Sequence, residues 1–169
     1  ESGVKWGMME VDTFKKCVDD LKKFPQRIKK IKIGNHGEPT MHPHVAELVK
    51  YARDANVADI VEMFTNGSRL EPELNQKLVD AGVVGVVGHL NSGTTIPASK
   101  IYSDAGIAQI SPSATNVNYT NQGYKTAFRV IANDAQQGRV LGNYAVKLGA
   151  KKIAVIDART DYGKGLAEE

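Results

Sequence analysis

The chain has 169 residues, a formal net charge of +3 and a single cysteine, Cys17. This length can bury one substantial core, and the mild charge, with no aromatic residues interleaved among the N-terminal lysines and arginines, disfavours a nucleic-acid surface. One cysteine excludes a disulfide framework, a CxxC zinc site and a thiolate-bound iron–sulfur cluster.

No apolar run reaches the length needed to span a membrane, and the first residues lack the apolar core of a signal peptide. We therefore expect a protein that stays in the cytoplasm as expressed and binds neither membrane nor nucleic acid. No cofactor, metal or obligatory partner is predicted. Composition does not distinguish a monomer from a dimer.

The first half of the chain alternates helical and strand patterns. Apolar spacing predicts an amphipathic helix from Val11 to Phe24, ended by Pro25, with Cys17 on its apolar stripe and therefore in the core. Further strands are predicted over 28–34 and 59–64, and further helices over 43–56, with Asn56 as C-cap, and 71–82. Strand–helix–strand order requires right-handed crossovers and a parallel sheet.

The loops of this half resemble a middle piece of a radical S-adenosylmethionine enzyme barrel. The resemblance rests on Gly37-Glu38-Pro39, Met41-His42-Pro43, Thr65-Asn66-Gly67 and the helix from Leu74 to Gly82. It implies that Gly37, Glu38 and Pro39 hold the methionine end of the cofactor and that Asn66 lies near its ribose. The family's three cluster cysteines are missing, so no electron can reach the sulfonium, and we expect no catalysis.

Polar residues of the same loop admit simpler roles. His36, His42 and His44 match no helix-based pair of metal ligands and have no supporting thiolate, which favours ordinary loop polarity over a metal site. Glu38 can accept backbone amides at a helix N-terminus without any ligand.

The stretch 83–90, VVGVVGHL, predicts the central strand of the sheet. A continuous β-branched run between Gly82 and the turn at 91–93 is typical of a parallel strand covered on both faces. An aspartate in place of Val86 or Val87 is therefore expected to prevent folding, because it would bury an unpaired charge.

The second half continues the alternation. A helix is predicted with Pro97 in its first turn and Gly106 as its stop. The other predicted elements are a strand over 108–110, a polar connection over 117–126, a short extra strand over 128–130, a helix capped by Asn133 or Asp134, a fifth strand over 152–156 and the first turns of a helix over 164–169.

This half resembles the N-terminal lobe of a type I periplasmic binding protein, in the branch that supplies branched-chain amino acids to ABC transporters. The runs that carry the resemblance are GHLNSGTTIPASKIYSDAGIAQISPSATN, YKTAFRV, DAQQG and KKIAVIDARTDYGKGLA. The resemblance implies that five residues line an amino-acid cleft: Ser92, Ser113, Ala114, Thr115 and Tyr162, with Tyr162 over the ligand side chain.

Local chemistry agrees with this implied site. Ser92 and the amides of Gly93 and Thr94 lie where a strand turns into a helix, a natural cradle for an α-carboxylate. The carbonyl of Ser113 and the hydroxyl of Thr115 could accept the ammonium group. Ordinary helix capping is the alternative role for these residues. Without a second lobe to bury the ligand, we expect weak binding at a half-cleft.

Together these patterns predict one α/β domain over 1–169. The expected fold is a doubly wound three-layer αβα sandwich with a five-stranded parallel sheet in the flavodoxin-like order 2-1-3-4-5 and an extra N-terminal helix. The favoured functional hypothesis is an engineered chimera, joined between 82 and 83, with no complete natural activity. The alternatives are weak branched-chain amino-acid binding, residual S-adenosylmethionine binding without catalysis, and a natural gene fusion.

Overall fold

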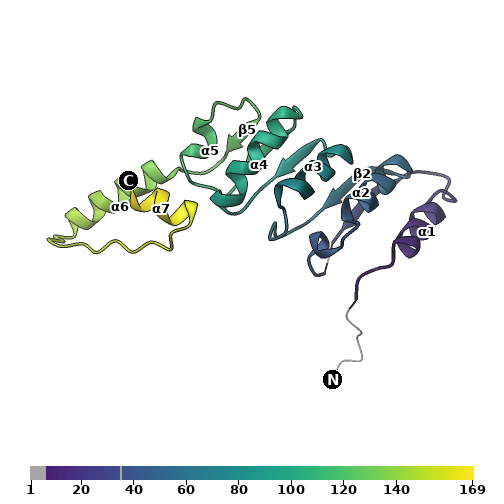
Figure 1. Ribbon diagram of the computed structural model, residues 1–169, viewed down its shortest axis with the longest axis horizontal. Helices are drawn as coiled ribbons and strands as arrows, with labels where there is room; N and C mark the ends of the chain where they lie inside the picture. Colours follow the sequence, from purple (N-terminus) through teal and green to yellow (C-terminus); the bar gives the residue numbers. More distant parts are fainter. Residues whose placement is uncertain (1–6, 35) are drawn as a thin grey trace, which may run out of the picture. The chain divides into compact units, whose positions relative to one another are not determined.

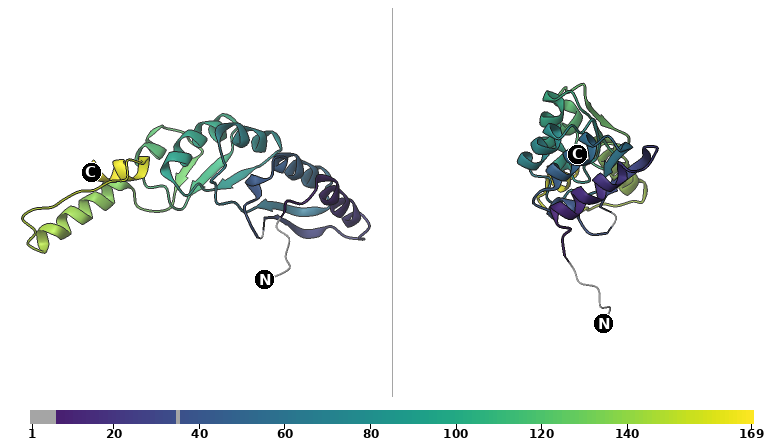
Figure 2. Two further views of the ribbon diagram at one scale, coloured as in Figure 1. Left: turned by 60° about the horizontal axis from the view of Figure 1, so that its bottom comes forward. Right: turned by 90° about the vertical axis from the view of Figure 1, so that its right-hand side faces the viewer.

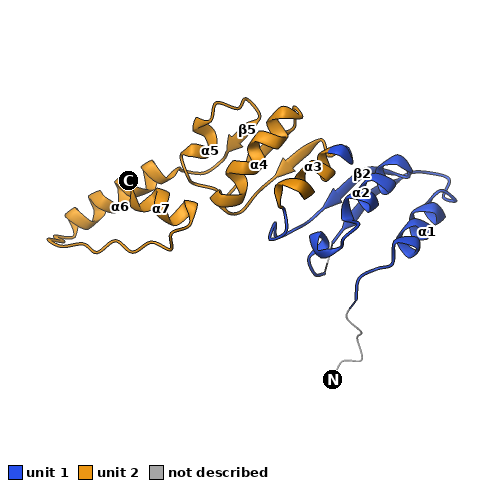
Figure 3. Ribbon diagram, viewed as in Figure 1, with its two compact units in different colours: residues 1–70, 80–82 blue, residues 71–79, 83–169 orange. Residues whose placement is uncertain are grey.

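The computed structural model describes residues 7–34 and 36–169, which form two compact units. Unit 1 comprises Glu1–Leu70 and Asp80–Gly82, and unit 2 comprises Glu71–Val79 and Val83–Glu169 (Figure 3). Among the residues described, no helix combines the length and apolar character needed to cross a membrane. Each unit is described by itself below, and the single domain stays a prediction.

Unit 1 is a two-stranded parallel sheet with helices packed against it (Figure 1). Its elements are α1 (Val11–Leu21), β1 (Ile28–Ile33), the short 3₁₀ helix η1 (Pro39–Met41), α2 (Val45–Asp54) and β2 (Ala58–Met63). Ile28 pairs with Ala58 and Ile33 with Met63, so the predicted parallel pairing of the first two strands is confirmed. The core forms around Val18, Ala52 and Val57.

Two details of the first helix differ from the prediction. It ends at Leu21, and the amide of Phe24 donates instead to the carbonyl of Leu21 at 3.2 Å, because a residue before proline avoids the α conformation. Cys17 is exposed, and its neighbour Val18, only 2% exposed, is the residue that faces the core. The prediction that Cys17 is a core residue is therefore wrong.

Unit 2 is a three-stranded parallel sheet, ordered β3-β4-β5, with helices beside it. Its elements are α3 (Pro72–Asp80), β3 (Gly85–Val87), α4 (Ser92–Asp104), β4 (Ala108–Ser111), α5 (Asn118–Asn121), β5 (Ala127–Arg129), α6 (Asp134–Lys147) and α7 (Asp161–Ala167). The core comprises Ala98, Tyr102 and Ile107, with Val79 and Val86 packed against it. The predicted α/β class, with parallel strands and helices, is confirmed.

The VVGVVGHL stretch is not a strand buried on both faces. Only Gly85–Val87 is a strand, Val84 and Val87 are 92% and 82% exposed, and Val86 packs against the core. The glycines at 82, 85 and 88 shorten the run because they add no side chain to pack. Within unit 2 this strand lies at the end of the sheet, beside β4.

The predicted fifth strand over 152–156 is also wrong, because another segment takes its place. These residues belong to no strand and are exposed, whereas β5 pairs with β4. The polar connection after β4 folds into α5 and then β5. Tyr119, fully buried on α5, donates its hydroxyl to the carbonyl of Gln109 in β4 at 2.9 Å and fixes this return. The predicted order 2-1-3-4-5 placed the segment 152–156 beside strand 4, and that part of the order is wrong. The predicted pairing of strands 1 and 3 stays a prediction.

The residues at which the helices of unit 2 begin shape the candidate site. α4 begins at Ser92, so Pro97 is its sixth residue and lies beyond the first turn that was predicted for it. α6 begins at Asp134 behind a capping box, in which Asn133 accepts from the amide of Gln136 and the side chain of Gln136 accepts from the amide of Asn133. α6 and α7 lie side by side, joined by an extended connection (Figure 2).

Candidate amino-acid site

The start of α4 and the loop after β4 meet in unit 2. Ser92 is 1% exposed, and its hydroxyl oxygen accepts a hydrogen bond from the amide of Asn116 at 3.3 Å. Ser111, at the end of β4, accepts from the amides of Ser113 at 3.3 Å and Ala114 at 2.8 Å. The structure therefore brings Ser92 close to the segment 113–116, two parts of the predicted site.

The N-terminus of α7 lies against the same place. The side-chain amide of Asn116 donates to the carbonyl of Asp161 at 2.6 Å. A Cβ atom added to Gly93 would lie 3.0 Å from a carboxylate oxygen of Asp161. Thr160 begins the helix by accepting from the amide of Gly163 at 3.0 Å. Tyr162 is thus on the helix that reaches the site, although 46% of its surface is exposed.

One backbone amide of the predicted carboxylate-binding site, that of Thr94, already has a hydrogen-bond acceptor. The amide of Thr94 donates to the carbonyl of Asn91 at 3.2 Å, and the Thr94 hydroxyl donates to the same carbonyl at 3.0 Å. The amides of Ser92 and Gly93 precede it in the first turn, where helix N–H groups have no intrahelical acceptor. A carboxylate at this helix would therefore meet the amides of Ser92 and Gly93 rather than that of Thr94.

Two buried polar groups at this place have no hydrogen-bond partner among the residues that the structure describes. They are the hydroxyl of Thr115, a residue 5% exposed, and the carboxylate of Asp134, a residue 0% exposed. Buried polar groups nearly always have a partner, so these two groups are candidates for hydrogen bonds to a ligand or to ordered water. The sequence pattern points to Asp134 only as a helix cap, because nothing local reveals that it is buried.

A polar network in unit 2 joins the loop after β3 with α3, α4 and the end of β4. The carbonyl of His89 accepts from the hydroxyls of Ser111 at 3.0 Å and Thr95 at 3.3 Å. Tyr102 donates its hydroxyl to the side chain of Asn75 at 2.8 Å, and Nε2 of His89 lies 3.3 Å from that hydroxyl. Burial lowers the pKa of His89 from 6.5 to about 4, so the ring is neutral at pH 7.

The residues predicted to bind S-adenosylmethionine lie in unit 1, and the carboxylate of Glu38 among them is already hydrogen-bonded within the protein. Glu38 accepts from the amide of Thr40 at 2.8 Å, from the amide of Asn66 at 2.6 Å and from the hydroxyls of Thr40 and Thr65. Burial acts to raise the pKa of Glu38, but these hydrogen bonds together lower it. Gly37 and Pro39 flank this carboxylate in the chain. Because both its oxygens already have donors, Glu38 acts as the cap of η1 that the sequence suggested as its simpler role.

The ring of His42, one of the histidines of this loop, makes two contacts with the backbone. The amide of His44 donates to Nδ1 of His42 at 3.1 Å, and Nε2 of His42 lies 2.9 Å from the carbonyl of Met9. In the part of the chain that the structure describes, no group of three or more histidine, cysteine, aspartate or glutamate side chains could hold a metal ion.

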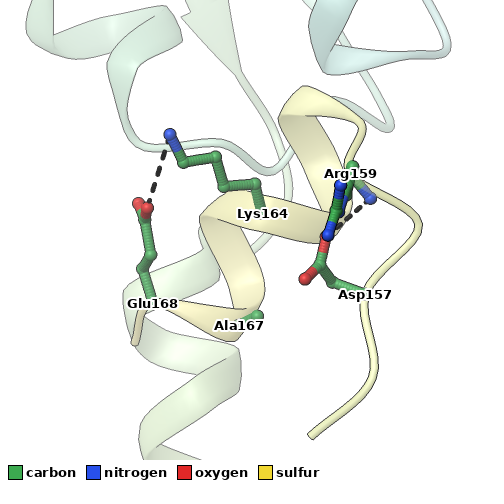
Figure 4. A pocket seen from close by; sticks show the side chains of 5 residues that line it. All are labelled: Asp157, Arg159, Lys164, Ala167 and Glu168. Atoms are coloured by element: carbon green, nitrogen blue, oxygen red, sulfur yellow. Dashed lines mark hydrogen bonds and ion pairs between the residues drawn. The ribbon is translucent and has the colours of Figure 1, made fainter.

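An open pocket of about 440 Å³ lies on α7 and the connection before it (Figure 4). Its lining residues are Asp157, Arg159, Lys164, Ala167 and Glu168. Lys164 and Glu168 form an exposed ion pair at 3.7 Å, and the amide of Arg159 donates to Asp157 at 2.6 Å. The pocket contains none of the predicted ligand residues. Two of its charged side chains, Lys164 and Glu168, pair with each other, and the carboxylate of Asp157 accepts from a backbone amide.

A profile of the family described as periplasmic binding protein matches residues 73–169, more than half of the chain. The chain belongs to the periplasmic binding protein family. The match begins at 73 rather than at the predicted join after 82, so α3 goes with the later part of the chain. The division into units likewise assigns Glu71–Val79 to unit 2. The radical S-adenosylmethionine resemblance of residues 1–82 stays a prediction.

Curated members of the family are similar to this chain over its second half. The "Leu/Ile/Val-binding protein homolog 1" of Brucella abortus (strain 2308) is 51% identical over 94 residues, 55% of this chain and 25% of the relative. The "Leucine-, isoleucine-, valine-, threonine-, and alanine-binding protein" of Pseudomonas aeruginosa is 46% identical over 94 residues, with the same coverage. This chain therefore spans about a quarter of the length of these curated relatives.

Solved structures of transporter substrate-binding proteins match more of the chain. The branched-chain amino acid transporter substrate binding protein LivJ of Streptococcus pneumoniae, in complex with isoleucine, gives a TM-score of 0.58 at 28% identity and covers 85% of this chain and 45% of LivJ. A Desulfitobacterium hafniense ABC transporter substrate-binding protein, in complex with Leu, gives a TM-score of 0.56 at 27% identity over 83% of this chain and 45% of that protein.

Proposed function

We propose that unit 2 binds a branched-chain amino acid, weakly, at the start of α4. The observation that carries the proposal is the convergence of Ser92, the loop 113–116 and the start of α7, which meet at Asn116. In the same loop the hydroxyl of Thr115 is buried and has no partner among the described residues. Support comes from the relatives, which are named as amino-acid-binding proteins and not as enzymes. Two solved relatives hold leucine or isoleucine.

Each group has a chemical role in this proposal. The hydroxyl of Ser92 and the amides of Ser92 and Gly93 bind the α-carboxylate, because helix N-termini favour anions. The Ser113 carbonyl and the Thr115 hydroxyl accept the ammonium group. Ala114, 1% exposed, lies between them in the loop, and Tyr162 covers the aliphatic side chain. Delivery of the ligand to a transporter is an expectation for the longer relatives. The cytoplasmic location as expressed stays a prediction, although the family is named for the periplasm.

Calorimetry on the full chain tests the proposal. Leucine, isoleucine and valine should release or absorb heat on binding at millimolar concentrations. Ser92→Ala should weaken leucine binding about tenfold, the effect of one lost hydrogen bond to a charged group. Ser103→Ala, near the other end of α4, is the matched control. No heat with any of the three ligands at millimolar concentration would refute the proposal.

A second proposal concerns ancestry rather than binding. The chimera hypothesis is favoured by the start of the family match at residue 73 and by the division of the chain near the same point. A natural protein matching continuously across residues 60–85 would overturn the engineered chimera. Residual S-adenosylmethionine binding would require a free Glu38 carboxylate. A thermal shift with the cofactor that is lost in Glu38→Gln would support that binding, and no shift would exclude it.

A further inference from the structure

Residues 152–156 form an apolar segment that the rest of unit 2 leaves uncovered. The segment belongs to the connection between α6 and α7, which runs back along α6 (Figure 2). Ile153, Val155 and Ile156 are 60%, 67% and 93% exposed. Within the part of the chain that the structure describes, the backbone of this segment makes no hydrogen bond to other backbone groups. An extended β-branched run with open backbone edges is a template for pairing with another strand.

The helix before this segment exposes an apolar stripe. Val140, Tyr144 and Leu148 recur at intervals of four residues on α6, and Leu141 lies on the same face. These side chains are 58% to 69% exposed. At roughly 100 Å² for each such side chain, the stripe and the segment together expose roughly 700 Å² of apolar surface. Each partner of a standard interface buries about 800 Å², so this area suits a stable dimer.

The charges that flank the segment are complementary to those of its own reversed sequence. A two-fold axis between antiparallel copies of one strand sets the central residue opposite its own copy. With Ala154 at the centre, Lys151 lies opposite Asp157 of the second copy, and Ile153 lies opposite Val155 of the second copy. Centred on either neighbour of Ala154, the axis would set Lys151 or Asp157 opposite an apolar residue. One register therefore pairs both the charges and the apolar side chains.

We propose that this surface binds a second copy of the chain. Residues 152–156 of the two copies pair as antiparallel strands about a two-fold axis at Ala154, and the α6 stripes of both copies cover the pair. Such an interface is closed, so it gives a dimer and not a fibre. Dilution separates the copies, and only the monomer leaves the segment open to proteases. The inference goes beyond the proposed amino-acid binding, because no proposed ligand group belongs to this surface.

Sedimentation equilibrium of the full chain tests the dimer. The mass should rise from one chain to two between roughly 1 and 100 μM, the weak end of affinities for an interface of this size. Leu141→Gln should raise the dissociation constant about tenfold, because each copy loses apolar burial. Val146→Gln is the matched control, since Val146 is 71% exposed on the same helix but lies off the stripe. A single-chain mass throughout, growth beyond two chains, or equal effects of the two variants would overturn the inference.

A charge exchange tests the register. Lys151→Glu should weaken the dimer about tenfold, because it sets like charges opposite each other at both ends of the strand pair. Lys151→Glu combined with Asp157→Lys should restore the affinity, and circular dichroism checks the fold of each variant. No recovery in the double variant would overturn the proposed register.

A cysteine at the centre tests the two-fold axis. Opposite Cβ atoms of antiparallel strands lie about 4.5–5.5 Å apart, close to the spacing of a disulfide. Ala154→Cys in a Cys17→Ser background should therefore give a covalent dimer on mild oxidation. Val155→Cys in the same background is the control, because its two copies would be offset by two residues along the strands and out of reach. Equally ready cross-linking of both variants would overturn the proposed axis.

Discussion

His89 makes the stability of unit 2 depend on pH. Its pKa is about 4 in the folded chain and close to 6.5 when unfolded, so the unfolded chain binds the extra proton between these values. The stabilisation is therefore present above pH 6.5 and is lost as pH falls towards 4. The difference corresponds to about 3 kcal/mol of unfolding free energy. Urea unfolding of the full chain at pH 7 and pH 4.5 measures it.

His89→Gln separates this effect from the other titrations. Glutamine can keep a hydrogen bond to Tyr102 but has no charge to gain, so most of the difference between pH 7 and 4.5 should disappear. Glu38 acts at lower pH, because its lowered pKa means that its contribution is lost below the ordinary range of a glutamate. An unchanged pH dependence in His89→Gln would show that the imidazole is not buried as described.

At the scale of the element, we expect substitutions of two valines in β3 to affect the free energy of unfolding very differently. Val86 packs against the core of unit 2, whereas Val87 is 82% exposed. Val86→Asp should lower the free energy of unfolding by several kcal/mol, because it places a charge against apolar side chains. Val87→Asp should change it by less than about 1 kcal/mol. Equal losses of unfolding free energy in the two variants would instead support the sequence-based prediction that this strand is buried on both faces.

The position of α7 over the site predicts that this helix has to move before a ligand enters. A Cβ atom at Gly93 would lie 3.9 Å from Cβ of Asp161, within the range of disulfides. Gly93→Cys with Asp161→Cys, in a Cys17→Ser background, should therefore cross-link α4 to α7. The oxidised protein should give no heat with leucine, and dithiothreitol should restore binding.

The control for this lock is the pair Gly93→Ser and Asp161→Ser, which cannot cross-link and should bind equally with and without reductant. Mass spectrometry verifies that the disulfide has formed. Equal binding by the oxidised and reduced cysteine variant would show that α7 does not obstruct the site.

Across the whole molecule, the two units predict that stability and binding can be changed separately. Val18 is 2% exposed in the core of unit 1, and every proposed ligand group belongs to unit 2. Val18→Ala should lower the unfolding free energy by about 2 kcal/mol through lost burial and a cavity. Leucine affinity at 25 °C should not change. Weaker leucine binding by folded Val18→Ala would show that the units are coupled.

The alternation of strands and helices could be predicted because periodicity, prolines and glycines act locally. The neighbour of β4 could not, since residues 127–129 and 152–156 both read as strands and only tertiary contacts, such as that of Tyr119, choose between them. Resemblance pointed to Ser92 and Thr115. The burial of Asp134 depends on where α7 packs, which no local pattern encodes.

The connection between α6 and α7 has a consequence for proteolysis. Residues 152–158 form neither helix, strand nor turn, and every residue from 151 to 160 is exposed. Proteases bind substrates as extended, unpaired chain, so trypsin should cleave native protein early after Lys151 or Lys152. The fragment bearing α7 would then be held only by contacts such as that between Asn116 and Asp161. A single cleavage would therefore leave α7 attached to the rest of unit 2 only by non-covalent contacts, so that dilution could release it.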